Sequence, residues 1–141
     1  MPARLIAVLL SLGIMMATSA PTRAEDAGPP LDCANATATA ELNACADKEL
    51  AAADTEINKV YTKALARIPS IAGEPPYDAK SFEAALRKSQ HAWVAYRDAD
   101  CKDLVPMSWA GGTATSGEVL GCMTAMTRAR TQVLVERYLL E

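Results

Sequence analysis

Apolar side chains recur every three or four residues along three stretches of the chain, which predicts three helices. The first helix is expected from Glu41 to Ile68, with inward positions at Leu42, Ala46, Leu50, Ala53, Ile57, Val60, Tyr61, Ala64 and Ile68. The second is expected at about 79–104, with inward positions at Phe82, Leu86, Ser89, Trp93, Tyr96, Arg97, Asp100 and Cys101. The third is expected from Glu118 to Leu140, with inward positions at Val119, Met123, Met126, Val133 and Leu134.

Stretches rich in proline and glycine separate these helices. The stretch 69–78 holds three prolines and a glycine, which predicts that the first helix stops before it. The stretch 105–117 contains Gly111 and Gly112, the expected turn between the second and third helices. No stretch has the pattern of a strand, so the expected fold is all-α: a small antiparallel three-helix bundle.

The first 24 residues have the composition of a signal peptide. Arg4 precedes an apolar run at 5–17, and the small residues Thr22 and Ala24 precede the expected cleavage point. This run is shorter than the roughly 20 residues that a membrane span needs. We therefore expect a periplasmic or secreted protein with no stable membrane anchor after cleavage, organised as a signal peptide at 1–24, an extended segment at 25–40 and a helical domain at 41–141.

Charge bears on the class of partner. Without Arg4 and Arg23, the expected exported chain has 12 basic and 17 acidic residues, a net charge of −5. Proteins that bind nucleic acid usually present a basic face, so this balance disfavours a nucleic-acid partner. It permits attraction to a basic protein, although it is also an ordinary value for a soluble domain.

The chain has four cysteines, all after the signal peptide, at Cys33, Cys45, Cys101 and Cys122. An even number of cysteines in an exported chain predicts a disulfide framework. All four are expected near one end of the bundle, so position alone leaves three connectivities open. The simplest pairs neighbours in sequence, Cys33 with Cys45 and Cys101 with Cys122.

Catalytic and metal sites find little support in the sequence. The only histidine, His91, and Cys101 lie on one predicted helix, about 15 Å apart along its axis, too far to act as a catalytic pair. There is neither a second histidine nor a C-x-x-C pair to complete a metal site. We therefore expect no enzyme, no metal and no cofactor.

Polar residues follow the apolar stripes of the first two helices and predict a polar seam between them. Arg97 is expected to pair with Asp54, and Gln90 or Asn58 to bond across the interface. Such groups fix the register of two helices or form a recognition surface, and the structural role is favoured because buried polar groups must be satisfied locally. The predicted seam consists of Asp54, Asn58, Tyr61, Gln90, Trp93 and Arg97.

Several short motifs together resemble the lysozyme inhibitor LprI-like N-terminal domain family, over most of the chain after the signal peptide. They fall on Cys33, Glu41/Asn43/Cys45, Asp54/Asn58/Tyr61, Gln90/Trp93/Arg97/Asp98/Cys101, Gly111/Gly112/Thr113 and Cys122/Thr127/Arg130. One departure is Ala38, where the family often has a capping serine or threonine.

The resemblance implies an exported, disulfide-bonded helical domain without catalytic residues, and it suggests inhibition of a basic c-type lysozyme. The expected binding loop is 105–117, with Trp109 as its aromatic anchor beside Gly111, Gly112 and Thr113. The alternative function is an envelope protein-interaction module that does not act on lysozyme and binds its target through the Asp54/Arg97 seam.

Overall fold

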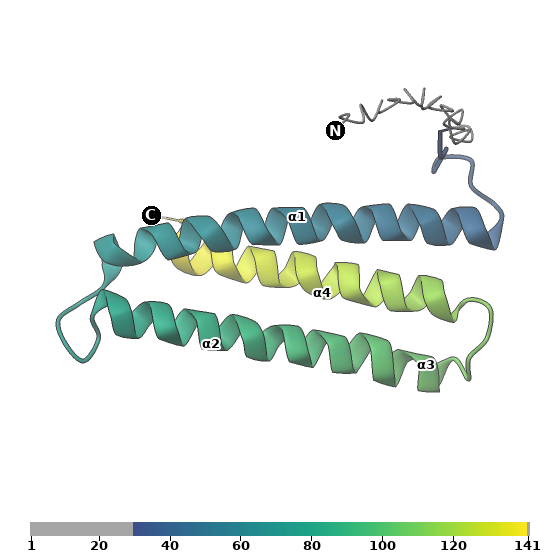
Figure 1. Ribbon diagram of the computed structural model, residues 1–141. Helices are drawn as coiled ribbons and strands as arrows, with labels where there is room; N and C mark the ends of the chain where they lie inside the picture. Colours follow the sequence, from purple (N-terminus) through teal and green to yellow (C-terminus); the bar gives the residue numbers. More distant parts are fainter. Residues whose placement is uncertain (1–29, 141) are drawn as a thin grey trace, which may run out of the picture. The chain divides into compact units, whose positions relative to one another are not determined.

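The computed structural model describes residues 30–140, so the predicted signal peptide lies outside the described residues. Within that range every regular element is a helix: α1 (Thr39–Ile71), α2 (Ala79–Asp98), the π-helical turn η1 (Ala99–Leu104), α3 (Val105–Ser108) and α4 (Thr115–Tyr138). The three long helices run antiparallel, and α2, η1 and α3 follow one another without a break (Figure 1). The predicted all-α three-helix bundle is confirmed.

Two helices start where side chains bond to free backbone N–H groups. The Asp78 carboxylate accepts from Ser81 N at 2.8 Å at the start of α2, and this backbone hydrogen bond holds the pKa of Asp78 below its usual value. At the start of α1 the cap position is Ala38, which has no polar side chain, but Glu41 Oε2 accepts from Ala38 N at 3.3 Å. Helix α1 therefore begins at Thr39, two residues before the predicted start.

The expectation that proline would stop α1 before residue 69 is wrong. Helix α1 contains Pro69 and ends at Ile71, where Ala72 N donates to Ile68 O at 2.9 Å. Proline has a backbone angle that suits a helix and lacks only one hydrogen-bond donor. In the last turn that loss is tolerated, because Ile68 is buried in the core and holds the helix against its neighbours.

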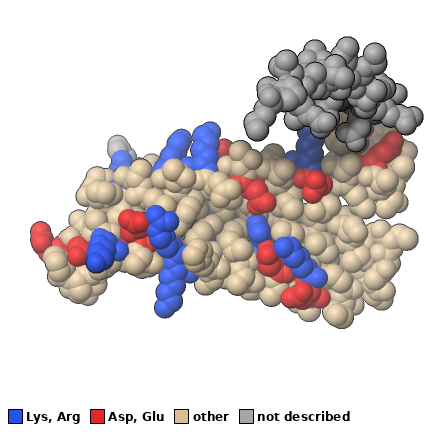
Figure 2. Space-filling model, viewed as in Figure 1, with Lys and Arg blue, Asp and Glu red and all other residues tan. Residues whose placement is uncertain are grey.

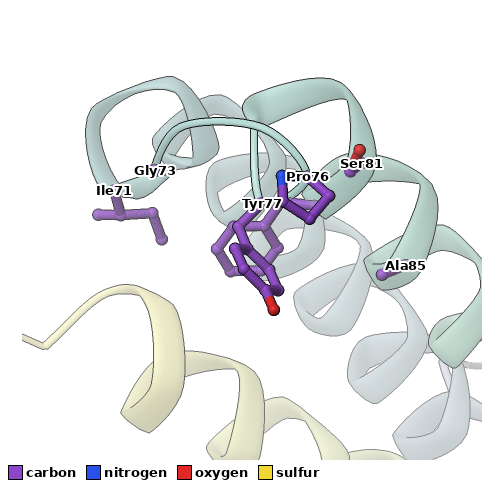
Figure 3. A pocket seen from close by; sticks show the side chains of 7 residues that line it. Ile71, Gly73, Pro76, Tyr77, Ser81 and Ala85 are labelled. Atoms are coloured by element: carbon purple, nitrogen blue, oxygen red, sulfur yellow. The ribbon is translucent and has the colours of Figure 1, made fainter.

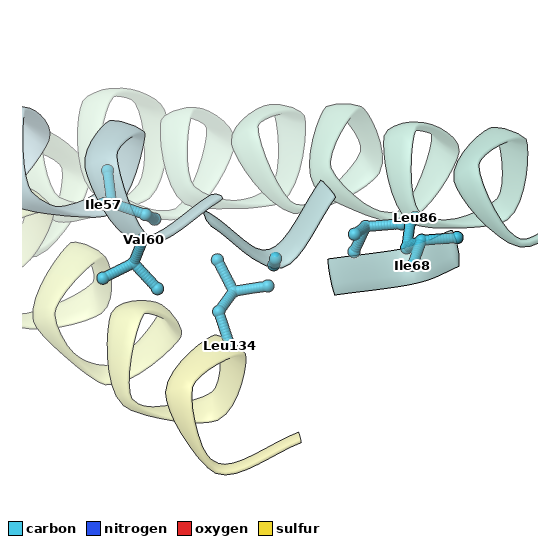
Figure 4. Close-up of a cluster of buried hydrophobic side chains, with 6 residues drawn as sticks. Ile57, Val60, Ile68, Leu86 and Leu134 are labelled. Atoms are coloured by element: carbon cyan, nitrogen blue, oxygen red, sulfur yellow. The ribbon is translucent and has the colours of Figure 1, made fainter. Parts of the chain in front are cut away.

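The main core lies where α1, α2 and α4 meet (Figure 4). Its buried members are Ile57, Val60, Ala64, Ile68, Leu86 and Leu134. Most predicted inward positions of the first helix, from Leu50 onward, are buried as expected. Leu42 is the exception, because it is 51% exposed in a surface hollow where α4 offers Gly121, which has no side chain to cover it.

Helices α1 and α4 form the closest pair of the bundle. Small residues make this possible: Ala53 and Ala64 of α1 are buried, and α4 buries the short polar side chains Thr124 and Thr127. Near the start of α4, a Cβ atom on Gly117 would lie only 3.1 Å from Asn43 Oδ1 of α1. Helix α2 depends on longer side chains to reach this pair.

Both sequence-local disulfides are present, which confirms the simplest of the three connectivities. Cys33–Cys45 ties the segment before α1 to that helix, across 12 residues of sequence. Cys101–Cys122 ties η1 to α4 across 21 residues. Cys101 is fully buried in a second, smaller core cluster with Leu50 and Met123. In the described part of the chain, no helix is both long and apolar enough to span a membrane.

Candidate functional site

The candidate site is the end of the bundle where η1 and α3 lead into α4. Val105 N donates to Asp100 O, a bond that spans one more residue than in an α-helix. Beyond this wide turn, three large apolar side chains stand in solvent, and we call them the apolar end patch: Leu104 is 59% exposed, Met107 79% and Trp109 46%. The face shown in Figure 2 carries few charged side chains at this end of the bundle.

The predicted loop 105–117 is shorter than expected, because both of its ends are helical. Residues 105–108 form α3, and α4 already begins at Thr115. The turn between them passes through two left-handed residues, Ala110 with φ 49° and Gly111 with φ 69°. Trp109 O accepts from Gly112 N at 3.0 Å, so the backbone that carries the tryptophan is fixed by the turn. Thr113 is exposed in the same turn.

The Cys101–Cys122 disulfide holds the base of the patch. Met126 Sδ lies 3.4 Å from Cys101 Sγ, so the bridge is packed on its inner side. The disulfide joins η1 to the second turn of α4, directly before and after the segment that carries the patch. The patch is therefore attached to a covalently closed, partly helical loop, which restricts its motion before any partner binds.

Acidic residues surround the patch in sequence. Asp100 and Asp103 belong to η1, and Glu118 lies in the first turn of α4. None of these three carboxylates has a Lys, Arg or His nitrogen within ion-pair distance among residues 30–140. Asp98 differs, because Lys102 at 2.8 Å lowers its pKa, with a further contribution from Arg97. This end of the molecule thus combines apolar side chains with unneutralised negative charge.

Arg97 is the centre of the polar contacts between the helices. Its Nη1 donates to Asp54 Oδ1 of α1 at 3.1 Å and to Thr127 Oγ1 of α4 at 3.0 Å. Its Nε donates to Asp98 Oδ1 at 3.1 Å, and its guanidinium carbon lies 5.1 Å from the centre of the Trp93 ring. The Arg97 side chain is only 11% exposed. One side chain of α2 thus contacts both other long helices.

The other predicted seam residues are not all brought to Arg97. Gln90 accepts from Arg130 Nε of α4 at 3.1 Å, and Asn58 is exposed on α1. Tyr61 lies near Arg87 of α2, whose pKa is raised first by Glu83 and to a smaller extent by Tyr61. Sequence reasoning also missed Thr127 as a partner of Arg97. A threonine on the inner face of a helix, one turn from Met123, is the signal that could have identified it.

We expect Arg97→Ala to lower the free energy of unfolding by about 2 kcal/mol, because it removes charged hydrogen bonds and the packing on Trp93. The loss is kept below that of a fully buried ion pair because the Asp54 side chain is 43% exposed and can regain water. Urea unfolding followed by circular dichroism measures the difference.

Arg128→Ala is the matched control for this measurement. Arg128 pairs with Glu49 at 3.2 Å between exposed side chains, so its loss should cost less than about 0.5 kcal/mol. Equal stability of Arg97→Ala and the original protein would contradict the structural role and make Arg97 a binding residue.

A second hollow lies at the opposite end of the bundle, at the α1–α2 connection (Figure 3). Its volume is about 490 Å³, and its lining is uncharged: Ile71, Gly73, Pro76, Tyr77, Ser81, Phe82 and Ala85. Ser81 lies at the cap of α2, and Phe82 packs edge-on against Tyr138 at 6.0 Å between ring centres. The hollow holds no titratable pair that could catalyse a reaction.

Metal-ligating residue types meet only once in the described residues, where Asp100, Cys101 and Cys122 lie within 4.8 Å of one another. Both sulfur atoms of this group are joined in a disulfide, so neither is available as a thiolate ligand. His91 is exposed on α2. The geometry of this group therefore suits a structural bridge rather than a metal centre.

Comparison with known proteins gives two matches. A family model described as lysozyme inhibitor LprI matches residues 33–134, beginning at the first cysteine, within the predicted extended segment. An uncharacterized protein of Rhizobium meliloti (strain 1021) is 36% identical over 129 residues, which covers 89% of this chain and 91% of that protein. No solved structure matches the chain.

Proposed function

Because this chain belongs to the family of the lysozyme inhibitor LprI, we propose that it is an exported, non-enzymatic domain that binds and inhibits lysozyme. The apolar end patch is the proposed contact surface, and Trp109 is its anchor. The two disulfides support export, since such bonds persist in oxidising compartments such as the periplasm or the medium.

The observation that carries this proposal is the exposure of Leu104, Met107 and Trp109 on a segment held by the Cys101–Cys122 bridge. Large apolar side chains that stand together in solvent are a common mark of a protein-binding surface. Tryptophan contributes more than most residues to such surfaces, because it buries a large area with few rotatable bonds. A surface that is fixed in advance also loses little conformational entropy on binding.

Charge supports the choice of a basic partner. The lysozymes of the c-type are strongly basic proteins, and the patch lies beside Asp100, Asp103 and Glu118, which have no basic partner within residues 30–140. Opposite charges at the rim of an interface accelerate association and orient the partners. We propose that these carboxylates lie at the rim and that Trp109 lies at the centre of the contact.

The alternative proposal is an envelope module that binds another target through the Asp54/Arg97 seam. The burial of Arg97 and its four contacts disfavour this proposal, since little of the guanidinium is left for a partner. The apolar end patch is the better docking surface of the two.

The test is protection of a Gram-positive cell suspension from lysis by a c-type lysozyme. The protein is recovered from the oxidising compartment of cells that express the full chain. We expect dose-dependent protection that disappears when the disulfides are reduced, because reduction frees the segment that carries the patch. No protection at micromolar excess of a folded, oxidised sample would remove c-type lysozyme as the target.

A further inference from the structure

A narrow groove runs between α2 and α4, away from the apolar end patch. Its volume is about 350 Å³, and it is lined by Trp93, Met126, Ala129, Arg130, Val133 and Arg137. Four of these side chains are apolar or aromatic, and the other two are arginines. The lining therefore offers positive charge next to an apolar surface.

The charge on Arg130 has only neutral partners. Its Nε donates to Gln90 Oε1 at 3.1 Å and its Nη2 donates to Ser89 Oγ at 3.0 Å. Burial lowers the pKa of Arg130, and the nearby positive charge of Arg137 adds to this effect, while Tyr138 opposes it. Neither arginine has a carboxylate within ion-pair distance among the described residues.

This situation differs from that of other arginines of the bundle. Arg87 pairs with Glu83, Arg97 with Asp54 and Asp98, and Arg128 with Glu49. An acidic protein with carboxylates to spare has thus left two neighbouring guanidinium groups without one. A partly buried positive charge beside a second one is unfavourable in the free protein, and an anion from outside would relieve it.

We propose that this groove binds a peptide C-terminus, with the carboxylate at Arg130 and Arg137 and the last apolar side chain against Trp93, Met126 and Val133. Guanidinium groups suit a carboxylate because they donate two parallel hydrogen bonds to its two oxygens. Trp93 is already held by Arg97, so the aromatic wall needs little ordering when the ligand binds.

The size of the groove selects this ligand over a lipid. Met126 to Val133 spans about 10 Å along the helix axis, which accommodates one or two residues and is much shorter than an acyl chain. A volume of about 350 Å³ lies at the small end of ligand sites. A single terminal carboxylate also matches a site that offers no more than two cations.

The test titrates the isotope-labelled protein, recovered as above, with N-acetyl-leucine, and follows the Trp93 indole and the Arg130 Nε–H by NMR. N-acetyl-leucinamide is the neutral control for the probe, and acetate is the control without an apolar group. We expect saturable shifts with N-acetyl-leucine and binding at least about tenfold weaker with either control, because each lacks one half of the recognition.

Arg137→Gln should weaken binding of N-acetyl-leucine by about tenfold without lowering the melting temperature appreciably, since Arg137 is exposed in the last turn of α4. Arg128→Gln, which changes an arginine on another face, should leave binding unchanged. The proposal is overturned if the amide or acetate binds as tightly as N-acetyl-leucine, or if Arg137→Gln binds like the original protein. Lysozyme inhibition by Arg137→Gln should be unaltered, so this result is independent of the proposed function.

Discussion

Replacing Trp109 with alanine is expected to weaken lysozyme inhibition by about thirtyfold, while the free energy of unfolding changes by less than about 1 kcal/mol. An aromatic anchor at the centre of an interface typically contributes about 2 kcal/mol or more to binding, which corresponds to that factor. Trp109 is 46% exposed and belongs to neither core cluster, so the fold does not depend on its side chain. The measurement is the concentration of protein that halves the rate of lysis, combined with a thermal melt of the same sample.

Tyr96→Ala is the matched control, because Tyr96 is a 61% exposed aromatic residue on α2, outside the apolar end patch. It should alter neither inhibition nor stability. Undiminished inhibition by Trp109→Ala would show that the contact surface lies elsewhere. A fall of many degrees in the melting temperature would show that the tryptophan belongs to the core.

The second large effect is expected from loss of the Cys101–Cys122 bridge. The double substitution Cys101→Ala/Cys122→Ala should lower the free energy of unfolding by about 3 kcal/mol, the value that loop closure predicts for a loop of this length. Some further loss is expected because Cys101 is fully buried against Leu50 and Met123. A small domain is stable by only about 5–15 kcal/mol, so this change is a large fraction of the total. Urea unfolding measures it.

The control for this substitution is loss of the other bridge, by Cys33→Ala/Cys45→Ala. Its loop is shorter, at 12 residues, and Cys33 is exposed, so the expected loss is smaller. Inhibition should fall with the first pair of substitutions more than with the second, since only the first bridge supports the patch. The opposite order of stabilities would contradict the burial argument.

Periodicity was enough to predict the three long helices, the antiparallel bundle and most of the buried face of α1. Helix patterns are reliable when an apolar stripe is long and packs on both neighbours, as it does from Leu50 to Ile68. The sequence-local disulfides and the resemblance to the LprI family are also confirmed. Each of these depends on spacing along the chain and not on distant contacts.

Features that depend on neighbouring elements could not be predicted in this way. Leu42 has the right spacing but lies opposite a glycine of α4, and Pro69 stays helical because Ile68 beside it is buried. The loop 105–117 was expected to be irregular because of its glycines, yet only its middle part is. Helix ends are determined by packing and by single hydrogen bonds, and periodicity contains neither.

The candidate site shows the same division. The pairing of Arg97 with Asp54 was expected from helix spacing, and the two side chains do meet. Their partner Thr127 and the bond from Arg130 to Gln90 come from α4, whose rotation relative to α2 is set by the whole core. The groove with two unpaired arginines depends on that rotation and had no signal in the sequence.

The wide turn of η1 has a consequence for how this surface could change. One extra residue in a helix rotates everything after it by about 100° around the axis. Deleting a single residue between Ala99 and Leu104 would restore the ordinary spacing and turn Met107 and Trp109 toward a different side of the rod. Insertion or loss of one codon at this point would therefore change which way the molecule faces a partner, with the three long helices unaltered.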